Sequence, residues 1–294
     1  MTDPHLSEVI GERRQLINLA YRLLGSLAEA EDVTQETYTR WYALSDRQRD
    51  AIENPGAWMT TVASRICLDL LGSARARREQ YVGDWIPEPV PGGWLDGSAP
   101  ADPADRVTLD ESVSMAFLVV LDSMTPAERV SFVLHDIFRY TFNEIADVVG
   151  RTPAACRQLA SQARRRIDTS RDHSSTERED LVRSFKQAWE AHDIEALVSL
   201  LDPQAVATAD GGGLALAFLE PISGAEQIAG AWMEIASRAP AVTLRECEVN
   251  GQPGLIGELD GTTVSVYAFD IADGRITRIW AVRNPEKLRP WGVA

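Results

Sequence analysis

Helix boundaries between residues 125 and 167 are marked more sharply than anywhere else in the chain. Thr125–Glu128 and Thr141–Glu144 both match the capping box, in which a hydroxyl and a carboxylate satisfy free backbone N–H groups at the start of a helix. Gly150 can adopt the left-handed conformation that ends a helix, and Thr152-Pro153 can begin the next helix two residues later. Two helices joined by so short a turn form a helix-turn-helix.

All the charged side chains of the second helix of this pair are basic, although the formal net charge of the chain is -15. Its apolar residues fall on one side of a helical wheel, and the other side carries Arg157, Gln158, Ser161, Gln162, Arg164 and Arg165. Arginine and glutamine can contact guanine and adenine edges in the major groove, while other arginines hold phosphates. Cations also favour the C-terminal turn of any helix, but this does not explain Arg157 and Gln158. The sequence therefore predicts a DNA-reading helix.

Periodicity and composition divide the chain into four segments. Residues 1–78 are predicted to be helical, with Asn54-Pro55 as the N-cap and first turn of one helix, and residues 107–172 form a second helical segment. Residues 79–106 between them are rich in proline and glycine, as linkers are, yet they carry large apolar side chains. We therefore expect part of this linker to dock on another surface. Residues 176–294 mix helical and strand patterns.

The last segment is predicted to be an α+β cone with a curved antiparallel sheet and internal room for a ligand. Its strand-like runs lie at residues 242–249, 255–259, 262–270 and 275–282. Asn250-Gly251, Asp260-Gly261 and Asp273-Gly274 separate these runs and favour two-residue hairpin turns. Ser223–Glu226 matches a third capping box. The expected fold class is multidomain, with two all-α domains followed by an α+β domain.

Composition argues against several classes of protein. The chain has no run of about 18 apolar residues that could span a bilayer, and its polar start lacks the apolar stretch of a secretory signal. We therefore expect a cytoplasmic protein with no membrane partner. Cys67, Cys156 and Cys247 lie far apart without a CxxC pair, which favours buried thiols over a metal site.

The last segment offers few groups for catalysis. Its nearest acid–base candidates are His192, Asp210, Tyr267 and Asp270, and each fits a plainer role at a helix junction, a turn, a strand end or in the core. We therefore expect no enzymatic activity, no cofactor and no metal. A pocket for a small-molecule ligand fits the cone better than an active site does.

Three separated motifs occur in an order that is typical of one family. Residues 30–42 read AEDVTQETYTRWY, residues 54–71 read NPGAWMTTVASRICLDLL, and residues 121–167 contain the helix-turn-helix. Together they closely resemble the extracytoplasmic-function sigma factors of bacterial RNA polymerase. The resemblance implies an alternative sigma factor that directs the polymerase to specific promoters and initiates transcription. Its implied partners are promoter DNA and the polymerase core, through the β′ clamp helices and the β flap.

The resemblance also implies roles for three sets of residues. The outward polar face of one helix would bind the polymerase, and it consists of Asp32, Gln35, Glu36, Thr39 and Arg40. The minus-ten promoter element would be read by Asn54, Trp58 and Arg65, although the position of Trp58 in a helical stripe also suits core packing. The minus-thirty-five element would be read by Arg157, Gln158, Ser161, Arg164 and Arg165.

Three further motifs narrow the resemblance to the sigma factors with a fused SnoaL-like C-terminal domain. They are YVGDWIPEP at residues 81–89, DGGG at residues 210–213 and NPEKL at residues 284–288. In that subgroup the C-terminal domain regulates the sigma domains in the same chain, and a separate anti-sigma protein is usually absent. Leu214 departs from the lysine that the subgroup commonly has after the glycines, so the charge contact of that lysine is in doubt.

We hypothesise that residues 81–89 dock near the other two motifs and hold the two DNA-binding domains in one relative placement. Burial of an exposed tryptophan or tyrosine contributes about 2 to 3 kcal/mol, which is enough to bias two arrangements more than tenfold. The residues expected to act in this regulation are Tyr81, Trp85, Pro87, Glu88, Pro89, Asp210, Gly211, Gly212, Gly213, Asn284, Pro285, Lys287 and Leu288.

A second class of function stays open at this point. The helix-turn-helix alone would also suit a ligand-controlled transcription regulator that binds duplex DNA without polymerase. Such a regulator is usually dimeric and binds symmetric half-sites, whereas a sigma factor binds its promoter weakly until the core enzyme is present.

Overall fold

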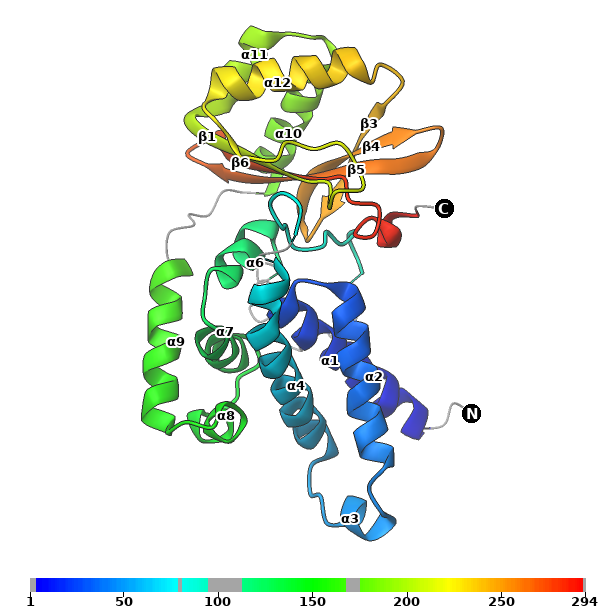
Figure 1. Ribbon diagram of the computed structural model, residues 1–294, viewed down its shortest axis with the longest axis vertical. Helices are drawn as coiled ribbons and strands as arrows, with labels where there is room; N and C mark the ends of the chain where they lie inside the picture. Colours follow the sequence, from blue (N-terminus) through cyan, green and yellow to red (C-terminus); the bar gives the residue numbers. More distant parts are fainter. Residues whose placement is uncertain (1–3, 79–80, 95–112, 168–174, 293–294) are drawn as a thin grey trace. The chain divides into compact units, whose positions relative to one another are not determined.

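The computed structural model describes residues 4–78, 81–94, 113–167 and 175–292. The second half of the predicted linker, residues 95–106, and the predicted domain boundaries at residues 107 and 172 lie outside these ranges. The described chain divides into two compact units (Figure 1). The first unit contains residues up to 77 together with residues 117–167, and the second contains residues 78, 81–94, 113–116 and 175–292.

The first half of the first unit is helical, as its sequence predicts. It consists of α1 (Pro4–Leu24), α2 (Leu27–Tyr42), α3 (Asp46–Asp50) and α4 (Pro55–Arg78). Ser26 caps α2, and the Asn54 side chain accepts a hydrogen bond from the backbone N–H of Ala57 at 2.9 Å, so α4 begins where the sequence predicts. The core includes Leu19, Leu23, Val33, Met59 and Ala63, all of them buried.

The second half of the first unit contains the predicted helix-turn-helix. Its elements are α6 (Met115–Asp122), whose first two residues are grouped with the second unit, α7 (Pro126–Phe132), the π-helical turn η1 (Val133–Ile137), α8 (Phe142–Val149) and α9 (Pro153–Ile167). Both capping boxes are present, at Thr125 and Thr141, and Gly150 ends α8 with φ 68° and ψ 35°. The apolar side of α9 packs against α7 and α8 through Cys156, Ala160 and Ala163. The helix boundaries predicted from Thr125, Thr141 and Gly150 are confirmed.

The two halves of the first unit contact one another through buried and exposed polar groups. The buried guanidinium of Arg129 donates to the backbone oxygen of Leu23 at 2.8 Å. Arg65 on α4 donates to the backbone oxygen of Asp147 on α8, also at 2.8 Å. Because a backbone oxygen accepts at each contact, these bonds do not depend on the identity of the accepting side chain.

The second unit is an α+β fold with one six-stranded sheet. Its helices are α10 (Ser175–Glu190), α11 (Ile194–Leu200), α12 (Ala225–Arg238) and the short 3-10 helix η2 (Arg289–Trp291). Its strands are β1 (Leu201–Asp210), β2 (Ile222–Ser223), β3 (Thr243–Val249), β4 (Gln252–Leu259), β5 (Thr262–Ala272) and β6 (Arg275–Val282), in the order β2-β1-β6-β5-β4-β3.

The sheet is mixed, so the expectation of an antiparallel sheet was wrong for one pair of strands. β1 and β6 pair in parallel, whereas all the other neighbours are antiparallel. The parallel pair forms because the chain leaves β1, crosses through β2 and α12, and returns along the hairpins β3 to β6. β1 itself lay outside the predicted strands, since Pro203 and three alanines give it little strand character.

Local turn chemistry in this unit was predicted correctly at three positions and wrongly at one. Asn250, Asp260 and Asp273 have φ near 50°, and each is followed by a glycine with positive φ, as two-residue hairpin turns require. The capping box at Ser223 was wrong, because Ser223 pairs with Val206 in the sheet and α12 is preceded by Gly224 without a side-chain cap.

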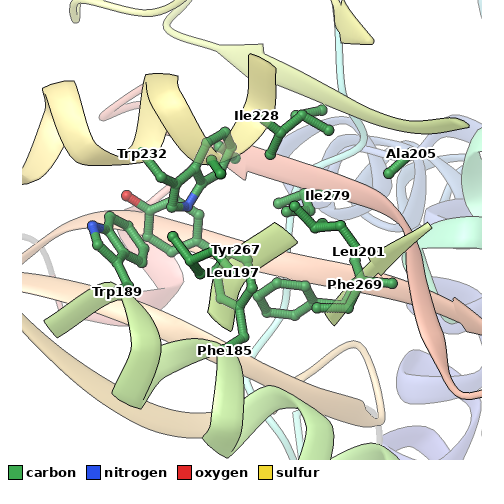
Figure 2. Close-up of a cluster of buried hydrophobic side chains, with 14 of the residues drawn as sticks. Phe185, Trp189, Leu197, Leu201, Ala205, Ile228, Trp232, Tyr267, Phe269 and Ile279 are labelled. Atoms are coloured by element: carbon green, nitrogen blue, oxygen red, sulfur yellow. The ribbon is translucent and has the colours of Figure 1, made fainter. Parts of the chain in front are cut away.

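The core of the second unit lies between the helices and one face of the sheet. Figure 2 shows Phe185, Trp189 and Trp232 from α10 and α12 beside Tyr267 and Phe269 from β5. Their rings meet edge to face or at a tilt, with centroids 5.2 to 6.5 Å apart. This aromatic cluster packs α10 and α12 against β5.

Candidate functional site

The outward side of α9 presents the predicted DNA-reading groups to solvent. Arg157, Gln158, Ser161 and Arg165 are all exposed. The guanidinium of Arg157 lies 5.2 Å from the centroid of the Phe142 ring at the start of α8, which orients it by a cation–π contact. The structure thus brings these four side chains onto one face, which we call the α9 face.

Arg164 also lies on this face, but a carboxylate within the chain holds it. Its Nε and Nη2 atoms lie 2.7 and 3.0 Å from the two oxygens of Asp136 on η1. Such a bidentate pair fixes the guanidinium plane. Sequence reasoning missed this partner because Asp136 lies 28 residues earlier in the chain and in another element.

Arg166 is paired as well, although its contacts are longer. It lies 3.4 Å from the carboxylate of Glu128, which is itself part of a capping box. Burial opposes ionisation of Glu128, but hydrogen bonds from Thr125 and the charge of Arg166 outweigh burial and hold the pKa of that carboxyl below its usual value. Glu128 therefore stays ionised and links the end of α9 to the start of α7.

The outward face of α2 contains the five side chains predicted to bind polymerase. They are all exposed: Asp32, Gln35, Glu36, Thr39 and Arg40. On the opposite face Ala30, Val33 and Thr37 are buried. Arg40 and Glu36 form an exposed ion pair at 2.8 Å, whose contribution to stability is small because solvent screens it.

The three residues assigned to the minus-ten element lie at separate points of α4. Asn54 is exposed and caps the helix, and Trp58 is half-buried one turn later, with its ring 5.3 Å from that of Trp41. Arg65 is exposed but donates to the Asp147 backbone. Trp58 thus combines packing with partial exposure, and both interpretations of it remain predictions.

In the second unit, the side chain of Asp210 at the end of β1 accepts hydrogen bonds from the linker. This residue is fully buried. Its Oδ1 accepts from the Tyr81 hydroxyl at 2.7 Å and from the Gly212 N–H at 3.0 Å. Its Oδ2 accepts from the Ile86 N–H at 3.0 Å and from Lys287 Nζ at 2.6 Å. We refer to Asp210, Lys287, Asn284, Tyr81 and Ile86 as the Asp210 cluster.

Lys287 is the positive centre of this cluster. It is 8 % exposed, and besides Asp210 its Nζ donates to the Ile86 backbone oxygen. The same Nζ lies 4.3 Å from the centroid of the Trp85 ring and 5.1 Å from that of Tyr81. Two aromatic faces and a carboxylate together replace the water that a buried ammonium loses.

Tyr81 acts as a donor in this cluster. Burial and the neighbouring Asp210 carboxylate raise the pKa of its phenol, so it stays protonated and donates to Asp210. The phenol oxygen in turn accepts from Asn284 Nδ2 at 2.8 Å, and Asn284 is itself buried. The motifs at residues 81–89, 210–213 and 284–288 therefore meet at one place.

The glycines after Asp210 are required by close approach. A Cβ on Gly212 would lie 2.3 Å from Asn284 Nδ2 and 3.0 Å from the Tyr81 hydroxyl, and a Cβ on Gly211 would lie 2.1 Å from the Ala215 backbone oxygen. Gly212 also has φ 58°, a conformation that other residues rarely adopt. Leu214, which follows the glycines, is 63 % exposed.

Among the remaining residues assigned to regulation, Pro87, Glu88, Pro89 and Leu288 are buried, and Pro285 is exposed. Sequence reasoning also missed the contacts of the linker with Trp291 and Asn250. Trp291 Nε1 donates to the Pro89 backbone oxygen at 2.9 Å. Asn250, predicted only as a turn residue, accepts from Val90 N–H at 3.1 Å and donates to the Val113 backbone oxygen at 2.9 Å.

The four acid–base candidates of the second unit serve separate local roles. His192 is exposed at the junction of α10 and α11 with φ 57°, and Asp270 accepts a hydrogen bond from Thr277. Tyr267 is buried against Trp189, and Asp210 binds the linker. Within the described ranges, no three His, Cys, Asp or Glu side chains are placed to hold a metal ion, and no helix is long and apolar enough to cross a membrane.

Comparison with known proteins accounts for this arrangement. The family model of sigma-70 region 2 matches residues 10–77, and that of sigma-70 region 4 matches residues 114–167. The ECF RNA polymerase sigma factor SigJ of Mycobacterium tuberculosis is 36% identical, with 96% of this chain and 93% of that protein covered. The probable ECF RNA polymerase sigma factor SigI of the same species is 35% identical, with 98% and 96% covered.

The similarity extends to the three-dimensional structure. The crystal structure of SigJ from M. tuberculosis matches with a TM-score of 0.76 at 33% identity, covering 97% of this chain and 98% of that one. The matches therefore include both helical halves and the C-terminal α+β unit. This chain belongs to the extracytoplasmic-function RNA polymerase sigma factors.

Proposed function

We propose that this protein is an alternative sigma factor that directs bacterial RNA polymerase to specific promoters and initiates transcription there. The observation that carries the proposal is the full-length similarity to sigma factors, joined to an exposed basic α9 face on a protein of net charge -15. Because polymerase is the partner, the protein acts in the cytoplasm. The protein contributes binding energy and no catalytic group.

The α9 face reads the minus-thirty-five element in this proposal. Arg157 and Gln158 are the groups suited to base edges in the major groove, and Ser161 and Arg165 flank them on the same exposed face. Arg164 can join them once it leaves Asp136. The exposed polar face of α2 binds the β′ clamp helices, the helix-turn-helix half binds the β flap, and α4 with Trp58 reads the minus-ten element.

Simultaneous binding of both promoter elements requires the first unit to open. The elements lie about 25 base pairs apart, and at about 3.4 Å per base pair this is roughly 85 Å. A compact unit of about 130 residues has a radius of gyration of only about 14 Å. The contacts of Arg129 with Leu23 and of Arg65 with Asp147 therefore have to break when polymerase and promoter bind.

The SnoaL-like C-terminal unit regulates this opening in the proposal, because it holds the start of the linker and the residue Val113 shortly before α6. Two residues separate the end of α4 from Tyr81, which is bound by Asp210, and one residue separates Val113, which is bound by Asn250, from α6. While these contacts persist, the two helical halves can separate only as far as the docked chain allows. No separate anti-sigma protein is needed for such control.

A gel-shift with one promoter of the host tests the sigma assignment. We expect a specific complex with core polymerase and weak binding without it. A ligand-controlled regulator would bind equally well without polymerase and would favour a symmetric site. That second class of function is not favoured, since the similarity covers both sigma regions.

Transcription by a variant of the Asp210 cluster tests the regulation. Asp210→Asn removes the charge that holds Lys287 and weakens linker docking, whereas Asp260→Asn changes an exposed turn residue of the same unit. With saturating core enzyme, Asp210→Asn is expected to change promoter-specific transcript yield, and Asp260→Asn is expected to match the wild type. Equal yields from all three proteins would refute regulation by the docked linker.

A further inference from the structure

The π-helical turn η1 carries two neighbouring side chains that contact the α9 face, one directly and one through another ring. Asp136 binds Arg164 with both carboxylate oxygens. His135, one residue earlier, stacks on Phe142 at the start of α8, and Phe142 in turn contacts Arg157. π-helical turns are rare and often occur at functional sites. This turn thus influences arginines at both ends of the α9 face.

The ring of Phe142 contacts both His135 and Arg157. Its centroid lies 4.0 Å from that of His135, and the two planes differ by 28°, so the rings stack. The guanidinium carbon of Arg157 lies 5.2 Å from the same Phe142 centroid. A guanidinium within about 6 Å of a ring face is attracted by the negative charge of that face. Phe142 therefore connects an exposed arginine to the scaffold of the helix-turn-helix.

Hydrogen bonds of the backbone fix the two rings. His135 Nδ1 lies 2.9 Å from the Tyr140 backbone oxygen, and because a carbonyl oxygen can only accept, Nδ1 carries a proton and donates the hydrogen bond. Phe142 is the first residue of α8, directly after the capping box in which the Thr141 N–H donates to Glu144 at 2.8 Å. The Phe142 ring is therefore placed by the helix cap and by the stack on His135.

An orienting contact matters greatly for an arginine that reads a base. The long side chain loses much rotamer freedom when its guanidinium is fixed on a base edge. A bidentate contact with guanine O6 and N7 also requires the guanidinium plane to face the base pair. A group that is already held in place loses less freedom on binding. Since only the matching base pair accepts both hydrogen bonds, the contact with Phe142 favours that base pair over the others.

We propose that Phe142, supported by His135, is a positioning residue for Arg157 and thereby strengthens the preference of the α9 face at one base pair of the minus-thirty-five element. The inference rests on the proposed role of Arg157 in reading that element. Phe142 needs no contact with a base, since it acts through the guanidinium that it orients. Gln158, the next residue, carries no charge and therefore gains nothing from the ring face.

Holoenzyme binding to a panel of single-base promoter variants tests this role. Arg157→Ala first identifies the position that Arg157 reads, as the one where base preference is lost. Phe142→Leu keeps an apolar side chain but removes the ring, and it is expected to lower the preference at that position about threefold, in line with an exposed cation–π contact. Phe142→Tyr keeps the ring face and is expected to retain the preference. Preference at the position read by Gln158 should not change in either variant.

Two controls separate positioning from a merely structural effect. Phe117→Leu removes a ring that pairs with Phe132 in the same half of the unit, and it is expected to leave every base preference unchanged. In an Arg157→Ala background, Phe142→Leu should cause no further loss of preference, because the group that it orients is gone. A further loss in that background would overturn the action of Phe142 through Arg157. Base preference is a ratio of affinities, so a smaller folded fraction does not alter it.

NMR relaxation of the Arg157 Nε–H group in the full-length protein tests the contact without polymerase or DNA. We expect the order parameter to fall below about 0.6, the range of mobile groups, in Phe142→Leu and to keep its wild-type value in Phe142→Tyr. His135→Asn keeps a donor for the Tyr140 oxygen but loses the ring, so it is also expected to lower the order parameter. An unchanged value in Phe142→Leu would overturn positioning by Phe142, and an unchanged value in His135→Asn would overturn the support by His135.

Failure of the positioning role is distinguishable from failure of the proposed function. If Arg157→Ala leaves base preference intact at every position, the DNA-reading role of Arg157 fails, and the positioning role fails with it. If Arg157→Ala relaxes preference at one position and Phe142→Leu does not, only the positioning role is overturned.

Discussion

The α9 face and the Asp210 cluster are both made of polar side chains, but they use them in opposite ways. On α9, Arg157, Gln158 and Arg165 are presented to solvent from a scaffold whose apolar side is buried. In the Asp210 cluster, each oxygen of Asp210 accepts two hydrogen bonds from within the chain. The comparison teaches that exposed polar groups are available to a partner, whereas buried polar groups with complete hydrogen bonding hold the chain itself together.

The largest expected effect comes from removing one charge of the buried ion pair. Asp210→Asn leaves the ammonium of Lys287 buried without its carboxylate, which typically costs about 3 to 5 kcal/mol. Urea denaturation followed by tryptophan fluorescence measures this loss in the free energy of unfolding. Asp260→Asn is the control, and a loss no larger than that of the control would show that the pair does not hold the linker.

Loss of a base contact from the α9 face is expected to have the next largest effect, on binding and not on stability. Arg157→Ala or Gln158→Ala should relax base preference at one promoter position by about 1 to 3 kcal/mol. Arg166→Ala should leave base preference intact and reduce the salt slope by about one. The measurement is holoenzyme binding to a panel of single-base promoter variants, with the exposed Arg238→Ala as control. Unchanged preference in both the Arg157 and Gln158 variants would remove the DNA-reading role of this face.

A smaller effect is expected from adding one methyl group under the linker. Gly212→Ala suffers both from the positive φ of this position and from overlap with Asn284 and Tyr81. Gly261→Ala suffers from a similar φ of +78°, but no atom lies within 4 Å of its added Cβ. We expect Gly212→Ala to reduce the free energy of unfolding by about 1 kcal/mol more than Gly261→Ala, because only the first overlaps its neighbours. Equal losses would contradict the packing of the linker on the glycines.

The smallest expected effect concerns the ion pair between Arg164 on the α9 face and Asp136. Asp136→Asn frees Arg164, and since the pair is partly exposed the free energy of unfolding should fall by less than about 1 kcal/mol. Holoenzyme affinity for the minus-thirty-five element should rise, with a salt slope steeper by about one phosphate contact. Asp180→Asn, which breaks an exposed pair in the other unit, is the control. Weaker promoter binding by Asp136→Asn would mean that Asp136 positions Arg164 for DNA.

Sequence patterns predicted the features that depend on neighbouring residues. The caps at Thr125 and Thr141, the end of α8 at Gly150 and the turns at Asn250 and Asp260 all follow from local backbone chemistry, and the structure confirms them. The basic face of α9 could be found in the same way, because it needs only the period of one helix.

Features that depend on distant residues could not be predicted from patterns. The parallel pairing of β1 with β6 joins strands that lie more than 60 residues apart, and Ser223 pairs with β1 where its sequence matches a helix cap. The partner of Arg164 and the second role of Asn250 likewise come from other elements. The meeting of the linker with Asp210 was expected from family resemblance, since no local pattern in the linker specifies its partner.

Single-round transcription with purified core polymerase tests the central claim most directly. With one promoter of the host as template, we expect the full-length protein to start RNA synthesis at a defined position, and core enzyme alone to produce no such transcript. Failure to initiate at any host promoter would contradict the roles proposed for the α9 face and for the two helical halves of the first unit.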